Sequence, residues 1–257
     1  MIQNKKIVQM PTAISEDQSN DTEIKRYLEE KESYQKSVDE LNEKEFTGEE
    51  LKEKYITVGI SKRHLEASID NIAKNVLEDL CGFFNKESYY IYGEVGCGKT
   101  YLVSALLKEY IINNKYKVVC LDKGTKYSSS PCVFMKSPWL PCFISLPDLL
   151  LKIRLAFKDN SEHTEESIIS EFTDKQFLVL DDMGVEKPSE WVMQTLYTII
   201  DRRNRDLKQT VFTSNYPIKG LKERVGERIV SRIVELCGKN NILNLKGKDR
   251  RLEGRHD

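Results

Sequence analysis

Residues 93–100 read Gly-Glu-Val-Gly-Cys-Gly-Lys-Thr and match the pattern G-x-x-x-x-G-K-[ST], a loop that wraps nucleotide phosphates in backbone N–H groups. An apolar run over residues 88–92 precedes the loop and predicts a strand, while residues 101–113 have the periodicity of an amphipathic helix. Strand, loop and helix in this order are what phosphate binding needs. The sequence therefore predicts a nucleotide-binding protein, against the alternative of a Gly-rich turn that happens to contain a lysine.

The residue types in this loop each have a chemical reason. The three glycines let the backbone approach the phosphates without a Cβ in the way, and the start of the following helix adds a partial positive charge. Lys99 is expected to reach the β- and γ-phosphates, and the Thr100 hydroxyl to ligate Mg²⁺. The residues expected to hold the nucleotide are Gly93, Glu94, Val95, Gly96, Cys97, Gly98, Lys99, Thr100 and Tyr101.

Two further apolar runs end in polar residues. Residues 177–182 read Phe-Leu-Val-Leu-Asp-Asp, so Asp181 is expected to hold Mg²⁺ and Asp182 to orient or deprotonate the attacking water. Paired acids also occur in turns, but the preceding phosphate loop favours the catalytic interpretation. Asn215 follows the run 210–213 and is expected to hold the catalytic water or the γ-phosphate, or else to be a turn former before Tyr-Pro.

The kind of nucleotide follows from a missing motif. Residues 181–184 satisfy the D-x-x-G pattern of GTPases, but a GTPase needs a guanine-reading motif downstream of its phosphate loop. The Asn-Lys pair followed by an acid, residues 85–87, comes before the loop. We therefore expect ATP and Mg²⁺ as cofactors.

Length and patterning predict the architecture. The chain has 257 residues and a net charge of −1, which suits one large domain with an appendage. Residues 1–58 are acidic with approximately helical spacing, and are expected to form a small helical region that docks a partner or is a solvated helix. Residues 59–257 are basic on balance and are expected to form the ATP-binding domain.

Apolar runs alternate with helical segments through this domain. Such alternation predicts an α/β fold in which a parallel sheet is flanked by helices. The insertion at 122–140 interrupts the pattern, and no function is assigned to it. The expected strands cover residues 88–92, 117–121, 141–146, 176–180 and 210–213.

Composition also bears on the compartment. The six cysteines are scattered without a C-x-x-C pair, which is typical of a reduced, cytoplasmic protein. Zinc binding through Cys120, Cys132 and Cys142 is a weak alternative, because their spacings are not those of known zinc modules. The sequence has no uncharged apolar run of 18 residues, so we expect no membrane insertion.

Taken in order, the motifs resemble the AAA+ ATPases, and within them the DnaC/DnaI-type helicase loaders and the related IstB-type transposition ATPases. The resemblance spans roughly residues 59–252. It is carried by GEVGCGKT (93–100), LVLDDMG (178–184) with EKPSEW (186–191), YTIIDRR (197–203), TSN (213–215), GERIVSRI (226–233) and GKDRR (247–251).

The resemblance implies further site residues. Arg232, or Arg228 in its place, would act as an arginine finger on the γ-phosphate of a neighbouring subunit, and Arg251, or the adjacent Arg250, would be the sensor-2 arginine. Asp182 stands where many AAA+ proteins have Glu, which implies slow hydrolysis. A finger that acts on a neighbour implies a homo-oligomer in the ATP state.

The same resemblance implies the partners. It points to an ATPase that loads the replicative DNA helicase onto single-stranded DNA, with residues 1–58 gripping the helicase. The alternatives are an IstB-like helper of a transposase, a small-molecule P-loop kinase and an adaptor that binds ATP without hydrolysing it. A kinase would leave the motifs at 213–215 and 226–233 unexplained.

Overall fold

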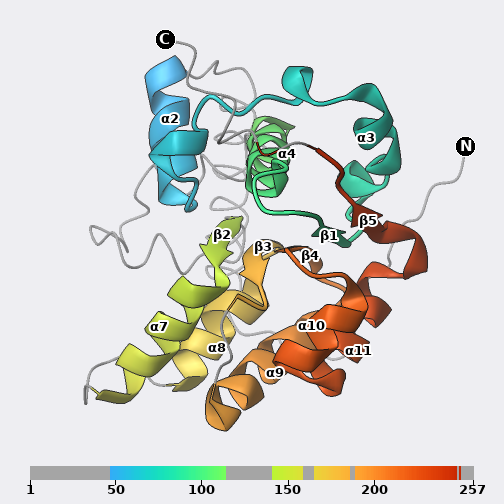
Figure 1. The fold of residues 1–257 in the computed structure, drawn as a ribbon. Coiled ribbons are helices and arrows are strands. Elements are labelled where there is room, and N and C mark those ends of the chain that lie inside the picture. Colours follow the sequence, from blue (N-terminus) through green and yellow to red (C-terminus); the bar gives the residue numbers. More distant parts are fainter. Residues whose placement is uncertain (1–46, 114–140, 159–164, 186–188, 248, 250–257) are drawn as a thin grey trace, which may run out of the picture. The chain divides into compact units, whose positions relative to one another are not determined.

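The computed structural model describes residues 47–113, 141–158, 165–185, 189–247 and 249 (Figure 1). The strands are β1 (Tyr89–Tyr92), β2 (Cys142–Ser145), β3 (Phe177–Met183), β4 (Gln209–Ser214) and β5 (Ile242–Asn244). The helices are α2 (Gly48–Thr57), α3 (Lys74–Asp79), α4 (Lys99–Asn113), α7 (Leu146–Lys158), α8 (Glu165–Asp174), α9 (Glu190–Arg205), α10 (Ile218–Val225) and α11 (Glu227–Cys237).

The five strands form one sheet in the order β2-β3-β4-β1-β5, and every pair of neighbours is parallel. The predicted α/β fold with a parallel sheet is therefore confirmed. The carboxyl ends of β3, β4 and β1 lie next to one another at one edge of the sheet, and in such folds this edge carries the ligand site. The phosphate loop and both polar strand ends are thus brought together by the strand order.

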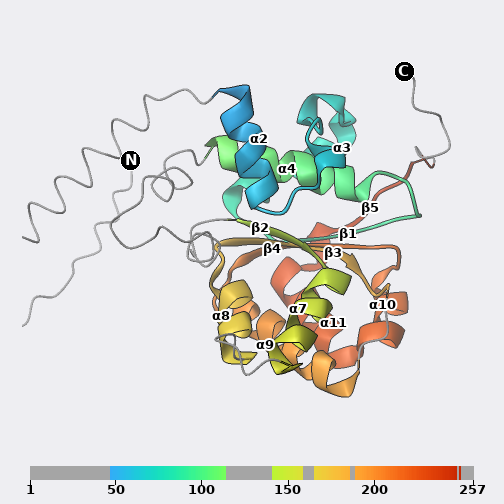
Figure 2. The same ribbon diagram turned by 90° about the vertical axis from the view of Figure 1, so that its left-hand side faces the viewer.

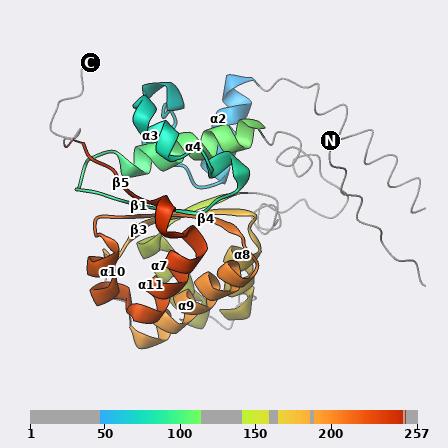
Figure 3. The ribbon, with the colours of Figure 1, turned by 90° about the vertical axis from the view of Figure 1, so that its right-hand side faces the viewer.

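Side chains alternate between the two faces of each strand, so the sheet contributes to two cores. In β1, Tyr89 and Ile91 pack into one core, whereas Tyr90 packs into the other. Figures 2 and 3 show α2, α3 and α4 over one face of the sheet and α7 to α11 over the other. Both faces are therefore covered, which explains why the strands of the sheet are largely buried on both sides.

Most expected elements are present, with small shifts at their ends. β3 extends three residues beyond the expected 176–180, and α4 begins at Lys99, inside the phosphate-loop motif. The short strand β5 was not expected, because its three residues carry too little periodicity to be distinguished from a loop. The expected strand 117–121 and the insertion 122–140 lie outside the described residues.

Helix α2 belongs to the same compact unit as the sheet, although its residues fall within the expected N-terminal region 1–58. Thr47 and Glu50 form a capping box at its start, with Glu50 N–H donating to Thr47 Oγ1 at 3.3 Å. Tyr55 is buried in the same core as β1. The last part of the acidic region is therefore packed on the nucleotide domain, while residues 1–46 lie outside the described part.

One charged side chain, Arg203 near the end of α9, is completely buried. Its Nε donates to Thr210 Oγ1 at 2.9 Å, and its terminal nitrogens donate to backbone carbonyls. Burial lowers the pKa of Arg203 to about 9, which still leaves it charged at neutral pH. It ties the end of α8 to the start of β4 through the carbonyl oxygens of Phe172, Thr173, Lys175 and Gln209.

Replacing this arginine is expected to destabilise the whole domain. Arg203→Met keeps much of the apolar volume but leaves four buried carbonyl groups without this donor, at about 1–3 kcal/mol each when unsatisfied. We expect the free energy of unfolding to fall by roughly 3 kcal/mol or more in a urea titration. Arg202→Met is the matched control, because Arg202 is partly exposed and pairs with the exposed Glu166 at 2.8 Å. Equal stability of the two variants would contradict a structural role for Arg203.

Candidate nucleotide site

The phosphate loop turns sharply between β1 and α4, and the sequence allows this turn through glycine. Gly96 and Gly98 have φ angles of 80° and 100°, a region that other residues rarely adopt. At Gly93 a Cβ would lie 2.3 Å from the carbonyl oxygen of Leu245, so a side chain has no room there. Loop shape and close packing therefore both depend on these three positions.

Lys99 begins α4 and is almost fully buried. Its Nζ donates to the carbonyl oxygens of Gly93 at 2.9 Å and Glu94 at 2.8 Å, and lies 3.9 Å from Cys97 Sγ. An ammonium group has three donors, and a thiol sulfur is a weak acceptor that a phosphate oxygen can replace. The lysine is thus held inside the loop with a donor available for an anion.

Asp181 lies in β3 beside Thr100, the residue after Lys99. Its carboxylate accepts hydrogen bonds from Thr213 Oγ1 at 2.5 Å and from Thr100 Oγ1 at 3.0 Å. Burial raises the pKa of Asp181 to about 6, although both hydrogen bonds oppose the shift. Thr100 and Asp181 offer hard oxygen ligands side by side, which is the donor set that Mg²⁺ takes when substrate phosphates complete its shell.

Asp182 has a left-handed backbone, with φ at 59°. It lies where the register between β3 and β4 shifts, and its N–H donates to Thr213 Oγ1 at 3.0 Å. Thr213 thus contacts both acids, its hydroxyl donating to Asp181 and accepting from Asp182. The bulge separates the two carboxylates: Asp181 turns toward Thr100, and Asp182 lines the open cavity.

A cavity of about 370 Å³ lies over the phosphate loop, within the size range of small-ligand sites. Among the expected loop residues, Gly93, Glu94 and Cys97 do not line the cavity. Tyr101 is one of the lining residues, and its hydroxyl accepts a hydrogen bond from Asn71 Nδ2 at 3.2 Å. The expected residues that line the cavity are Val95, Gly96, Gly98, Lys99, Thr100, Tyr101, Asp182 and Asn215.

Three further lining residues were not expected from the sequence: Arg63, His64 and Val185. Arg63 and His64 lie in a short 3₁₀ turn some thirty residues before the phosphate loop, where no motif marks them. Val185 follows the D-x-x-G stretch and is exposed at the cavity. The signal that could have found Val185 was its position directly after the acidic strand end.

The candidate finger residues lie on α11 and do not line this cavity. Arg232 forms ion pairs with Asp201 and Glu235 of its own chain. Arg228 is exposed, and within the described residues it has no hydrogen bond or ion pair. Neither arginine is therefore positioned at the nucleotide cavity of its own subunit.

The sensor-2 candidates Arg250 and Arg251 lie outside the described residues. The nearby Asp249 is described, and a Cβ built on Gly96 would be 1.8 Å from its Oδ1. The segment after β5 thus runs against the phosphate loop. Among the described residues, no three His, Cys, Asp or Glu side chains gather as a metal site, and no helix there has the length and apolarity to span a membrane.

Two curated helicase loaders are similar to this chain in sequence. The replicative helicase loader DnaC of Buchnera aphidicola subsp. Baizongia pistaciae is 24% identical over 185 residues, which are 71% of this chain and 65% of that protein. DnaC of Escherichia coli K12 is 22% identical over 161 residues, 63% of this chain and 55% of that protein. This chain is thus similar in sequence to the DnaC helicase loaders.

Solved structures agree on the fold of this DnaC-like chain. The crystal structure of the DnaC helicase loader matches with a TM-score of 0.55 at 24% identity, over 72% of this chain and 100% of that chain. DnaI matches with a TM-score of 0.55 at 20% identity, over 77% of this chain and 99% of that chain. The matches to the curated DnaC proteins span between about half and two thirds of their length.

A separate match concerns the start of the chain. A family model described as the 26S proteasome regulatory subunit RPN11 C-terminal domain matches residues 8–85. This range is less than a third of the chain and ends before β1 and the phosphate loop. The match includes the lining residues Arg63 and His64, but none of the phosphate loop or the polar strand ends.

Proposed function

We propose that this chain is an ATP-dependent loader of the replicative DNA helicase onto single-stranded DNA, and that it acts in the cytoplasm. The observation that carries the proposal is the convergence of Lys99, Asp182 and Asn215 on one cavity of a DnaC-like AAA+ fold. An AMPPCP-bound DnaA from Aquifex aeolicus, with a TM-score of 0.51 at 17% identity over 73% of this chain, supports ATP as the nucleotide.

The chemistry we propose at this cavity is hydrolysis of the γ-phosphate. Mg²⁺, when bound, neutralises charge on the phosphate oxygens. Thr100 and Asp181 would hold this ion, and Lys99 would contact the β- and γ-phosphates. Asp182 would take the proton of the attacking water, and Asn215 at the end of the neighbouring strand would orient that water.

Completion of the site is proposed to need a second copy of the chain. Arg232 lies on α11 outside its own cavity, so the finger role implied by the family resemblance requires a neighbouring subunit. ATP would then hold subunits together in a homo-oligomer. Residues 1–58 are proposed to grip the helicase, and the basic balance of residues 59–257 supports contact with DNA phosphates.

Binding of single-stranded DNA tests the proposal. We expect fluorescence anisotropy of a labelled oligonucleotide to rise with ATP and not with ADP, because assembly brings several weak basic surfaces onto one strand. Affinity should fall with added salt by a logarithmic slope of about −0.7 for each phosphate contacted. Adding the host's replicative helicase should give a ternary complex only with ATP, and the Lys99→Ala variant is the control that lacks the nucleotide response.

Two results would contradict the loader. Equal, salt-insensitive DNA binding in the ATP, ADP and nucleotide-free samples would favour an ATPase that binds only proteins. Recovery of a transposase instead of a helicase by the full chain from its host would favour the IstB-like alternative.

A further inference from the structure

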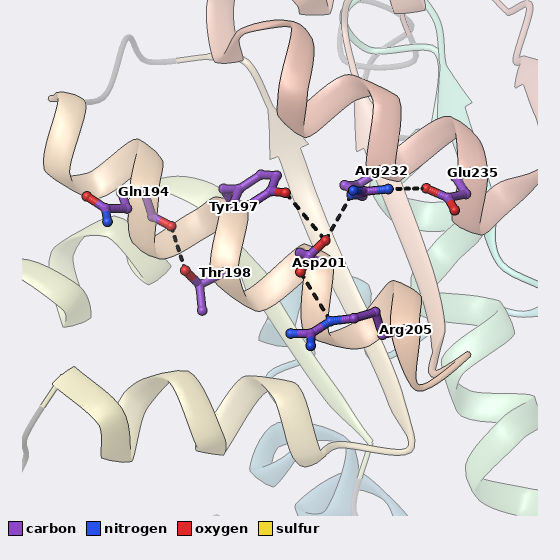
Figure 4. Close-up of polar contacts among 7 residues, drawn as sticks. All are labelled: Gln194, Tyr197, Thr198, Asp201, Arg205, Arg232 and Glu235. Carbon is purple, nitrogen blue, oxygen red and sulfur yellow. Dashed lines mark hydrogen bonds and ion pairs between the residues drawn. The ribbon is translucent and has the colours of Figure 1, made fainter.

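Arg232 lies in a network of charged side chains between α9 and α11 (Figure 4). Its Nε is 2.9 Å from Asp201 Oδ1, and its NH1 is 2.5 Å from Glu235 Oε2. The second oxygen of Asp201, Oδ2, is 3.2 Å from Arg205 Nε. The Tyr197 hydroxyl is 3.5 Å from Asp201 Oδ1. Asp201 is thus held from three sides, by two arginines and a tyrosine.

The two carboxylates that contact Arg232 differ in how firmly they are held. Asp201 has a side chain that is only 19% exposed, and it comes from the neighbouring helix α9. Glu235 is 56% exposed and lies three residues further along α11 itself. An exposed ion pair within one helix is weak and exchanges readily with solvent. Asp201 is therefore the anchor of Arg232, and Glu235 is an exchangeable partner.

The N–H donors of Arg232 thus have different partners, with Nε facing Asp201 and a terminal nitrogen facing Glu235. A guanidinium group is planar and carries five N–H donors, so fixing Nε also fixes the direction of the two terminal nitrogens. Hydrogen bonds with Tyr197 and Glu235 raise the pKa of Arg232, so it stays charged. Glu235 occupies one donor of NH1, and a phosphate approaching the terminal nitrogens would compete for it. A side chain fixed before docking loses less conformational freedom on binding.

We propose that Asp201 is a positioning residue, which holds Arg232 in the orientation that a neighbouring subunit's γ-phosphate requires, and that Glu235 competes with that phosphate for NH1. This inference rests on the proposed function, because it needs ATP hydrolysis in an assembly. It assigns opposite effects to two acids that touch the same arginine. Asp201 promotes hydrolysis, and Glu235 restrains it.

Matched substitutions test the proposal, because Asp201→Asn and Glu235→Gln each remove one negative charge beside Arg232. We expect Asp201→Asn to lower kcat about five- to tenfold with KM for ATP unchanged, the loss expected when one side chain must be ordered on docking. Glu235→Gln should turn over faster than the wild type, because a competitor of the phosphate is removed. The Arg232→Ala variant, measured in the same assay, gives the kcat that remains without the finger arginine.

Mixing two kinds of subunit distinguishes a loss of Arg232 positioning from damage to the fold of the Asp201→Asn variant. Asp182→Asn subunits have an intact Arg232 network and a site that binds ATP without turnover. When they are added to Asp201→Asn subunits, kcat for each intact site should return toward the wild-type value, because a sound finger now comes from the neighbour. Damage to the Asp201→Asn fold would not be repaired in this way.

The failures of the two proposals are distinguishable. If Arg232→Ala hydrolyses ATP like the wild type, the proposed finger in trans is wrong. If Arg232→Ala loses activity while Asp201→Asn keeps it, or if mixing restores nothing, the positioning role of Asp201 is wrong and the ATPase proposal stands. A Glu235→Gln rate equal to or below that of the wild type would overturn the competing role of Glu235.

Discussion

Lys99→Ala is expected to abolish nucleotide binding while leaving a folded protein. Among the described residues, Lys99 Nζ bonds within 3 Å to the carbonyl oxygens of Gly93 and Glu94 in its own loop, so its removal takes a charged donor from the cavity without touching the sheet. Hydrogen bonds to charged groups contribute about 1.5–3 kcal/mol, and Lys99 is expected to contact two phosphates, so affinity for ATP should fall at least about a hundredfold. Isothermal titration calorimetry with ATP measures this directly.

Two variants control the lysine experiment. Lys239→Ala removes an equal charge from an exposed turn and should bind ATP normally. Lys99→Arg keeps the charge but places a larger, planar group in a buried position, so it should also bind weakly. Wild-type affinity in a folded Lys99→Ala protein would refute the phosphate-loop assignment.

Asp182→Asn is expected to keep ATP binding and to lose turnover. The left-handed backbone at this position is tolerated by Asn as well as by Asp, so the substitution preserves the local structure where alanine would strain it. An amide cannot accept the proton of the attacking water, and loss of a general base costs roughly 10²- to 10⁴-fold in rate. Phosphate release and ATP affinity are measured on the same preparation.

The exposed Asp79→Asn, at the end of α3, is the matched control for this charge change. It should hydrolyse ATP at the wild-type rate. Unchanged phosphate release by Asp182→Asn would show that this acid has no part in hydrolysis, and would favour the adaptor that binds ATP as an assembly factor.

The sequence alone determined the parts of this protein that depend on local chemistry. Positions 96 and 98 have backbone angles that residues other than glycine avoid, so the phosphate loop could be identified from its sequence pattern. Apolar runs in β1, β3 and the middle of β4 alternate with helical segments along the chain, and this alternation predicted the parallel sheet. Each of these signals lies within a few consecutive residues.

Only the tertiary structure decided which distant residues meet. Arg63 and His64 reach the cavity from a turn with no motif, and the adjacent Arg202 and Arg203 differ completely in burial although both stand in a charged run. The pairing of Arg232 with Asp201 joins two helices separated by β4 and α10. Such contacts depend on how helices pack across the sheet, and helix packing is set by the summed shape of many side chains, which no short stretch of sequence encodes.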